Sequence, residues 1–225
     1  MRSAYLGPEY AARDIQAALQ QAGVAYTHHE DIDDEVARLV AENHVVARCS
    51  GAMEYGPRAL GNRSILYPAT DPGVNQWLNE RLHRTEFMPF APATLAEDAS
   101  ECYEDLPGAE FAAQFMTITF NCTAKMKRQC PAAVHVDGTA RPQLVSEQTN
   151  PGFYRILREY KRLTGISSMI NTSFNMHEEP IVCTPHDAVR SFLAGGVDYL
   201  AIGEFLVAAP HILRGEQVRP EAATV

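Results

Sequence analysis

The chain has 225 residues, of which 46% are hydrophobic and 21% charged, as is typical of a folded globular protein rather than a disordered one. Its formal charge of −9 argues against a broad nucleic-acid-binding face, because duplex binding usually requires a basic surface. No apolar run is long enough to span a bilayer, and the five cysteines form no C-x-x-C pair. We therefore expect a soluble cytoplasmic protein with no zinc knuckle, no nucleic-acid partner and no membrane partner.

Helices and strands are predicted to alternate along the chain. Apolar residues at helical spacing predict helices over residues 15–22, 32–40, 72–82, 96–103, 151–163 and 185–193. Short apolar or alternating runs predict strands over residues 24–27, 45–49, 64–67, 114–121, 133–136, 141–145, 166–170, 199–202 and 204–207. Asp137-Gly138 is a hairpin signal, which implies antiparallel as well as parallel pairing. We expect one α/β domain, a twisted mixed β-sheet with helices packed on it.

A glycine-containing loop between two predicted strands carries two arginines. Its sequence from Gly51 to Leu66 is G-A-M-E-Y-G-P-R-A-L-G-N-R-S-I-L. The glycines allow a close approach of the backbone to a ligand, and the planar guanidinium groups of Arg58 and Arg63 suit phosphate or carboxylate. The loop matches neither a P-loop nor a Rossmann fingerprint. We interpret it as an anion site; the alternative is a surface loop with solvated arginines.

Further polar groups follow other predicted strands and helices. A basic patch of His83 and Arg84 has Lys125 and Lys127 as candidate allies, and Arg141 lies on the predicted hairpin return. The strand at 166–170 runs into three small polar residues that suit hydrogen bonding of an amide-like group: Asn171, Ser173 and Asn175. The alternatives are that Arg141 pairs with an acidic neighbour and that the asparagines are ordinary turn residues.

Four long motifs carry a family resemblance. They are M-E-Y-G-P-R-A-L-G-N-R-S-I-L, F-M-P-F-A-P, H-V-D-G-T-A-R-P-Q-L-V and I-N-T-S-F-N-M-H-E-E-P-I-V. In this order they closely resemble the C-terminal domain of the carbamoyltransferases, a family that includes nodulation and antibiotic-tailoring O-carbamoyltransferases of the NodU/TobZ type. The likeness runs over residues 6–208. It implies a junction remnant at 1–10, a YrdC-like domain at 11–209 and a loose tail at 210–225.

The resemblance also implies an activity. In this family the domain takes carbamoyl phosphate and ATP, with Mg²⁺, and makes carbamoyl adenylate. A preceding N-terminal domain with an iron site then passes the carbamoyl group to a hydroxyl acceptor; it is absent here and would be a partner in cis or in trans. By motif, Arg58, Arg141 and Ser173 are the catalytic candidates. The residues expected to bind ATP or carbamoyl phosphate are these three with Arg63, His83, Arg84, Asn171 and Asn175.

One departure concerns the segment L-H-R-T-E-F-M-P-F-A-P, where relatives have K-x-R-E-x-F-R-P-F-A-P. His83 stands at the lysine position, and a mostly neutral histidine is a weaker phosphate partner at neutral pH. Two other functions stay open at this point. One is a nucleotide- or carbamoyl-phosphate-binding module that is inactive without its partner domain. The other is synthesis of threonylcarbamoyl adenylate, as in true YrdC proteins.

Overall fold

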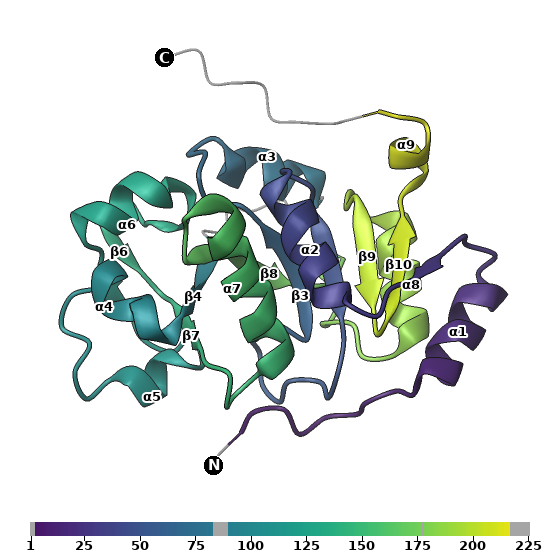
Figure 1. The fold of residues 1–225 in the computed structure, drawn as a ribbon, viewed down its shortest axis with the longest axis horizontal. Coiled ribbons are helices and arrows are strands. Elements are labelled where there is room, and N and C mark those ends of the chain that lie inside the picture. The colour runs from purple at the N-terminus through teal and green to yellow at the C-terminus, as the bar shows by residue number, and fades with distance from the viewer. Residues whose placement is uncertain (1–2, 83–89, 177, 217–225) are drawn as a thin grey trace.

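The computed structural model describes residues 3–82, 90–176 and 178–216, and its centre is a large mixed sheet (Figure 1). Eight strands lie in the order β1-β10-β9-β2-β3-β8-β4-β7. The pairs β2–β9 and β4–β7 are parallel, and the other pairs are antiparallel. The strands are β1 (Thr27–His28), β2 (Val46–Cys49), β3 (Arg63–Tyr67), β4 (Ala91–Leu95), β7 (Gln143–Val145), β8 (Ser168–Ser173), β9 (Tyr199–Ile202) and β10 (Phe205–Ala208). The expected mixed sheet is confirmed.

Helices cover both faces of this sheet. On one face α2 (Ile32–Ala41) and α7 (Pro151–Thr164) pack against each other and against the inward side chains of the strands (Figure 1). The larger core on the other face includes side chains of α1 (Ala12–Gln21), α3 (Val74–Arg81), α4 (Ala99–Cys102), α6 (Ala124–Gln129) and α8 (Pro185–Ala194). The remaining elements are α5 (Glu110–Ala113), α9 (Pro210–Leu213), the 3₁₀ turns η1 (Ala96–Asp98) and η2 (Pro131–Ala133), and the pair β5 (Phe120–Asn121) and β6 (Thr139–Ala140).

Helix α7 illustrates how local sequence fixes an element beside the site. The Asn150 side chain caps it by accepting a hydrogen bond from the Phe153 N–H at 3.1 Å, and Pro151 occupies the first turn. Gly165 ends the helix with φ of 75°, a left-handed conformation that favours glycine. The apolar stripe is fully buried against the sheet, so the start of α7 is held firmly at one end of the strands.

The sheet brings the predicted motifs to one end. Ser64 at the start of β3 pairs with Ser173 at the end of β8, and Ala91 at the start of β4 pairs with Asn171. Because β7 runs parallel to β4, its start, Gln143, lies at the same end. The glycine-containing loop, the segment before β7 and the segment after β8 therefore meet there.

Two predicted strands were wrong. Residues 114–121 alternate like a strand, but only β5 pairs; the rest continues the α5 turn, with the Thr117 hydroxyl donating to the Ala112 carbonyl at 2.8 Å. Residues 133–136 form no strand either: the 3₁₀ turn η2 ends at Ala133, and a hydrogen bond from the His135 N–H to the Thr139 carbonyl at 2.7 Å crosses the Asp137-Gly138 turn without starting a ladder. That turn exists, since the Gly138 N–H donates to the His135 carbonyl at 2.9 Å, but it leads into β6, whose partner is β5. Local alternation was overridden by long-range pairing.

The described chain ends in a short helix and the few residues that follow it. Residues 210–213, at the start of the expected loose tail, form α9. No helix in the described ranges is long and apolar enough to cross a membrane.

A buried carboxylate, Asp198, connects helices α3 and α9 to the start of β9. It accepts hydrogen bonds from the Val45 N–H at 2.8 Å and the His211 Nε2 at 2.7 Å, and it pairs with Arg81. Burial alone would raise the pKa of Asp198. The imidazoles of His44 and His211, the charge of Arg81 and the Val45 N–H outweigh burial and lower the pKa to about 2.

This lowered pKa predicts a pH-dependent stability. The unfolded pKa, 3.8, lies above the folded value, so the stabilisation is complete above pH 3.8 and is lost as the pH falls through about 2. Asp198→Asn should therefore lower the free energy of unfolding by about 2 kcal/mol at pH 6, and the deficit should shrink near pH 2. Urea denaturation at several pH values measures this. A deficit that is equal at every pH, or equal to that of the exposed control Asp14→Asn, would contradict it.

Candidate functional site

Two buried side chains, Asn171 and Gln143, connect three of the predicted motif segments by hydrogen bonds. The Asn171 side-chain amide of β8 donates to the Gln143 Oε1 at 2.8 Å and to the Ala59 carbonyl at 3.3 Å. The Gln143 amide donates in turn to the Leu60 carbonyl at 2.7 Å. Asn171 and Gln143 are both almost fully buried, so water competes little for these bonds. These hydrogen bonds fix the positions of the segments that carry Arg58, Arg141 and Ser173. Asn171, which the sequence analysis predicted as a ligand-binding residue, has a structural role in this hydrogen-bond network.

Arg58 and Arg141 come together at the wall of one cavity. This cavity has a volume of about 500 Å³, and none of the described residues that line it carries a carboxylate. Arg141 is half-buried, and burial, followed by the positive charge of Arg58, lowers the pKa of its guanidinium. Within the described part of the chain, neither arginine forms an ion pair. Two unneutralised cations at one wall favour an anionic ligand.

Ser173 and Asn175 extend the end of β8. The Ser173 hydroxyl donates to the Asn175 Oδ1 at 2.6 Å, and the Asn175 amide donates to the Met176 and Glu179 carbonyls at 2.9 Å each. Both side chains are half-buried. Because side chains alternate along a strand, Ser173 lies on the same face of β8 as Asn171. The predicted phosphate-binding residues His83 and Arg84 lie outside the described residues.

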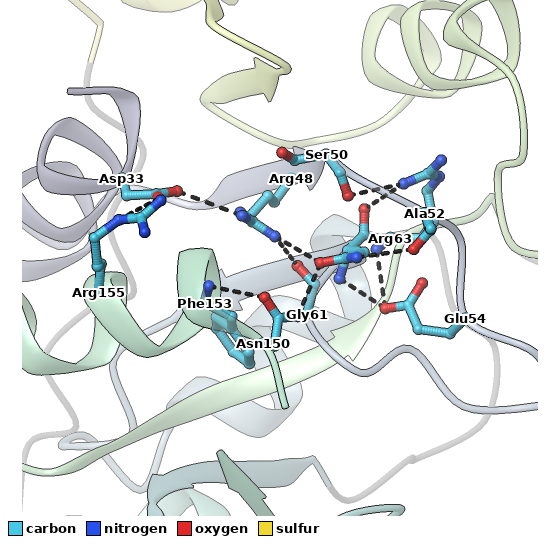
Figure 2. Close-up of polar contacts among 11 residues, drawn as sticks. Asp33, Arg48, Ser50, Ala52, Glu54, Gly61, Arg63, Asn150, Phe153 and Arg155 are labelled. Atoms are coloured by element: carbon cyan, nitrogen blue, oxygen red, sulfur yellow. Dashed lines mark hydrogen bonds and ion pairs between the residues drawn. The ribbon is translucent and has the colours of Figure 1, made fainter. Parts of the chain in front are cut away.

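Arg63 lies apart from the other two arginines of the prediction. It is only 1% exposed, and its Nη1 donates to the carbonyls of Ser50, Gly51 and Asn62 at 2.9–3.2 Å. Figure 2 shows the contact with Ser50. Nη2 donates to the Pro8 carbonyl at 3.4 Å. The guanidinium therefore holds the loop together from inside, and it does not line the cavity of Arg58 and Arg141.

A residue that the sequence analysis missed, Glu54, organises the same loop. It is buried, and its Oε1 accepts hydrogen bonds from the N–H groups of Leu60, Asn62 and Arg63 at 2.7, 2.7 and 3.2 Å. Figure 2 shows Glu54 beside Arg63. One carboxylate oxygen thus closes the loop over Arg58. The only sequence signal was an acidic residue inside an otherwise basic, glycine-containing motif.

A second missed group joins the loop to α2 and α7. Arg48, buried on β2, donates to the Gly61 carbonyl at 2.7 Å and to the Asn62 Oδ1 at 3.0 Å. It also pairs with Asp33 of α2 at 3.4 Å, and the other oxygen of Asp33 pairs with Arg155 of α7 at 2.7 Å (Figure 2). A single arginine in a short buried strand was the available signal.

A second cavity, of about 880 Å³, has part of the N-terminal segment, including Tyr5 and Tyr10, in its lining and contains this network at its wall. Its lining mixes arginines with six carboxylates: Glu9, Glu30, Asp31, Asp33, Asp34 and Glu204. Since Asp33 already neutralises Arg48 and Arg155, this cavity suits a polyanion less well than the smaller one. The described residues contain no group of three or more His, Cys, Asp or Glu side chains that could hold a metal ion.

Comparison with protein families decides the ancestry. Residues 37–209 match the family model described as carbamoyltransferase C-terminus. The chain belongs to this family.

Named relatives agree with this assignment. The chain is 36% identical over 207 residues to nodulation protein NolO of Bradyrhizobium diazoefficiens, which covers 90% of this chain and 38% of that protein. It is 34% identical over 214 residues to nodulation protein NolNO of Sinorhizobium fredii, covering 92% of this chain and 31% of that protein. The chain thus spans about a third of the length of these carbamoyltransferase-family relatives.

Solved structures establish the fold. Full-length HypF in its phosphate- and nucleotide-bound form superposes with a TM-score of 0.57 at 18% identity, covering 79% of this chain and 25% of that one. Sua5 of P. abyssi complexed with L-threonine superposes with a TM-score of 0.54 at 12% identity, covering 79% of this chain and 47% of that one. The expected YrdC-like fold of the carbamoyltransferase C-terminal domain is therefore confirmed.

The role of Glu54 predicts a large effect on stability. Glu54→Ala leaves three buried N–H groups without an acceptor, so the free energy of unfolding should fall by about 3 kcal/mol. Urea denaturation measures it. The exposed Glu9→Ala is the matched control and should change stability by no more than about 0.5 kcal/mol. Equal stabilities of the two variants would show that Glu54 does not hold the loop.

Proposed function

We propose that this domain makes carbamoyl adenylate from carbamoyl phosphate and ATP. The observation that carries the proposal is the convergence of Arg58 and Arg141, without a neutralising carboxylate, at the wall of one cavity. Both substrates are polyanions, and the reaction moves phosphoryl and acyl-phosphate groups. Such a site would need fixed positive charge more than a nucleophile. Because the chain belongs to the carbamoyltransferase family, we assign a carbamoyl group as the group that is activated at this site.

The overall reaction balances with one water. Carbamoyl phosphate, ATP and water give carbamoyl adenylate, pyrophosphate and inorganic phosphate. Arg141 would hold the phosphate of carbamoyl phosphate and stabilise the charge that develops as it leaves, and Arg58 would bind the triphosphate. Burial of Arg141 strengthens its interaction with an anion, since the surroundings screen charge less than water does.

The end of β8 would supply hydrogen bonds to the same anions. Ser173 is positioned by its bond to Asn175, and the two bonds from the Asn175 amide to backbone carbonyls hold this segment in place; to bind an anion, the Ser173 hydroxyl would turn from Asn175 and donate to the anion instead. His83 and Arg84 are proposed as further phosphate-binding residues from their motif. Because the described residues offer no metal cage, Mg²⁺ would arrive with ATP as part of the substrate, bound to its phosphates. The HypF structure that shares this fold was itself solved with phosphate and nucleotide bound, which supports a polyanion site.

The whole relatives are about three times longer than this chain, and we propose that the remainder transfers the carbamoyl group to a hydroxyl acceptor. The chain would then be the activating half of a two-part enzyme. A binding module that holds ATP or carbamoyl phosphate without turnover is the second candidate, favoured by the same difference in length.

Arg141→Ala tests the proposal. The measurement is pyrophosphate release with MgATP, in the presence and absence of carbamoyl phosphate. The wild-type chain should release pyrophosphate only when carbamoyl phosphate is present, and the variant should be slower by about 100-fold. The exposed Arg13→Ala is the matched control and should retain wild-type rates.

Three outcomes separate the candidates. Wild-type turnover in Arg141→Ala would remove this arginine from the mechanism. Binding of both substrates by calorimetry without any pyrophosphate release would leave the binding module. Pyrophosphate release with bicarbonate and threonine, and without carbamoyl phosphate, would instead indicate threonylcarbamoyl-adenylate synthesis.

A further inference from the structure

The cavity at Arg58 and Arg141 is larger and more aromatic than an anion alone requires. A volume of about 500 Å³ lies in the range of sites for drug-sized molecules, roughly 300–1,000 Å³. A phosphate group or carbamoyl phosphate has few atoms and would fill only the part beside the arginines. Tyr55, Phe111 and Phe115 line the rest.

The aromatic side chains leave ring surface available. Tyr55 is 72% exposed and Phe111 is 59% exposed, which is unusual for large apolar side chains beside a cavity. Phe111 and Phe115 meet edge to face, with ring centroids 5.3 Å apart and an interplanar angle of 74°. Phe115 is partly buried against a small apolar cluster, so the exposed ring of Phe111 is the one of this pair that offers a surface for stacking with a flat ligand.

The backbone beside these rings is held in a strained conformation. Met116 has φ of 54°, in the left-handed region that a residue with a side chain rarely adopts. Its side chain is buried and lines the same cavity. Strain of this kind costs about 1–3 kcal/mol and is found most often at ligand sites. Here it turns the chain after α5 so that Phe111, Phe115 and Met116 all line one cavity.

The charges of the lining residues distinguish this cavity from the larger one. The 880 Å³ cavity has six carboxylates in its lining, and two of its arginines are already paired with Asp33. The aromatic cavity has two arginines and no carboxylate among the described lining residues. A ligand with both a flat apolar end and a polyanionic end therefore matches the aromatic cavity of Arg58 and Arg141 better than the larger cavity.

We propose that this aromatic cavity holds the base of a nucleoside triphosphate, stacked on Phe111 and flanked by Tyr55, with the triphosphate at Arg58 and Arg141 left to the carbamoyl phosphate. The inference rests on the proposed use of ATP and adds the residues that take its base. In this arrangement α5 and the following turn form the base-binding wall, and the glycine-containing loop contributes both a phosphate-binding arginine and one aromatic ring.

Phe111→Ala separates the base from the phosphates. The full chain and the variant are titrated calorimetrically with MgATP and, separately, with magnesium tripolyphosphate, which has the phosphates but no base. Because base stacking on one aromatic ring contributes substantially to affinity, Phe111→Ala should weaken ATP binding roughly tenfold and leave tripolyphosphate binding unchanged. Tyr55→Ala should act in the same direction. Leu193→Ala, which removes an exposed apolar side chain on α8, is the control and should change neither.

Each other outcome overturns a distinct part. If Phe111→Ala and Tyr55→Ala bind ATP like the wild type, the base lies elsewhere, and the exposed rings become a docking face for the rest of the longer protein. If Phe111→Ala weakens ATP and tripolyphosphate equally, the ring supports the phosphate end and not the base. If the wild-type chain binds tripolyphosphate but gains nothing from the base of ATP, the base site is absent while the anion site stands. If it binds neither ligand, the proposed function fails together with the base site.

Discussion

The buried carboxylate of Glu54 is the constraint on which the rest of the candidate site depends. Three N–H groups of the loop, those of Leu60, Asn62 and Arg63, converge on one of its oxygens. A loop of this composition has a large conformational entropy, because glycine restricts the backbone least. Bonds to a buried charge offset that entropy more effectively than bonds to a neutral acceptor. The part of the loop that follows Arg58 is therefore held in one conformation.

Around this carboxylate, positive charge is distributed between two tasks. Arg48 and Arg63 are buried and directed at backbone carbonyls, so their charge is used to hold the chain. Arg58 and Arg141 face a cavity and repel each other. Bringing two like charges together costs free energy in the empty protein, and a bound anion would relieve that cost. This division explains why a count of arginines in the motif overstates the number that meet a ligand.

The sequence was sufficient for the interleaved helices and strands, the mixed sheet and the family, because helix caps and long motifs are local signals. Asn150 with Pro151, and Thr184 with Pro185, begin helices α7 and α8 where the pattern placed them. The strand predicted at 114–121 failed because its alternation has no partner strand beside it, a condition that no local pattern reveals.

For the candidate site too, the sequence indicated some residues and missed others. Arg58 and Arg141 could be predicted as candidates because cations in loops at strand ends are a chemical signal, and their role in binding a ligand stays a prediction. The different role of Arg63 followed only from its three-dimensional surroundings, since its neighbours Ser50, Gly51 and Pro8 are distant in sequence. Glu54 was missed because its partners are backbone groups, and a backbone partner leaves no trace in residue type. Gln143 was missed because its partners, the Asn171 amide and the Leu60 carbonyl, are distant in sequence.

The contact between Gly61 and Phe153 has an evolutionary consequence. Gly61 has φ of 112°, and a side-chain carbon added there would overlap the ring of Phe153 in the first turn of α7. The loop and the helix start are therefore packed without spare room, and Arg48 and Asn150 join them from two further directions. Neither segment is free to change alone. Lineages that alter the helix start should alter the loop with it, so the two segments, about ninety positions apart in the chain, are expected to drift as one inherited unit.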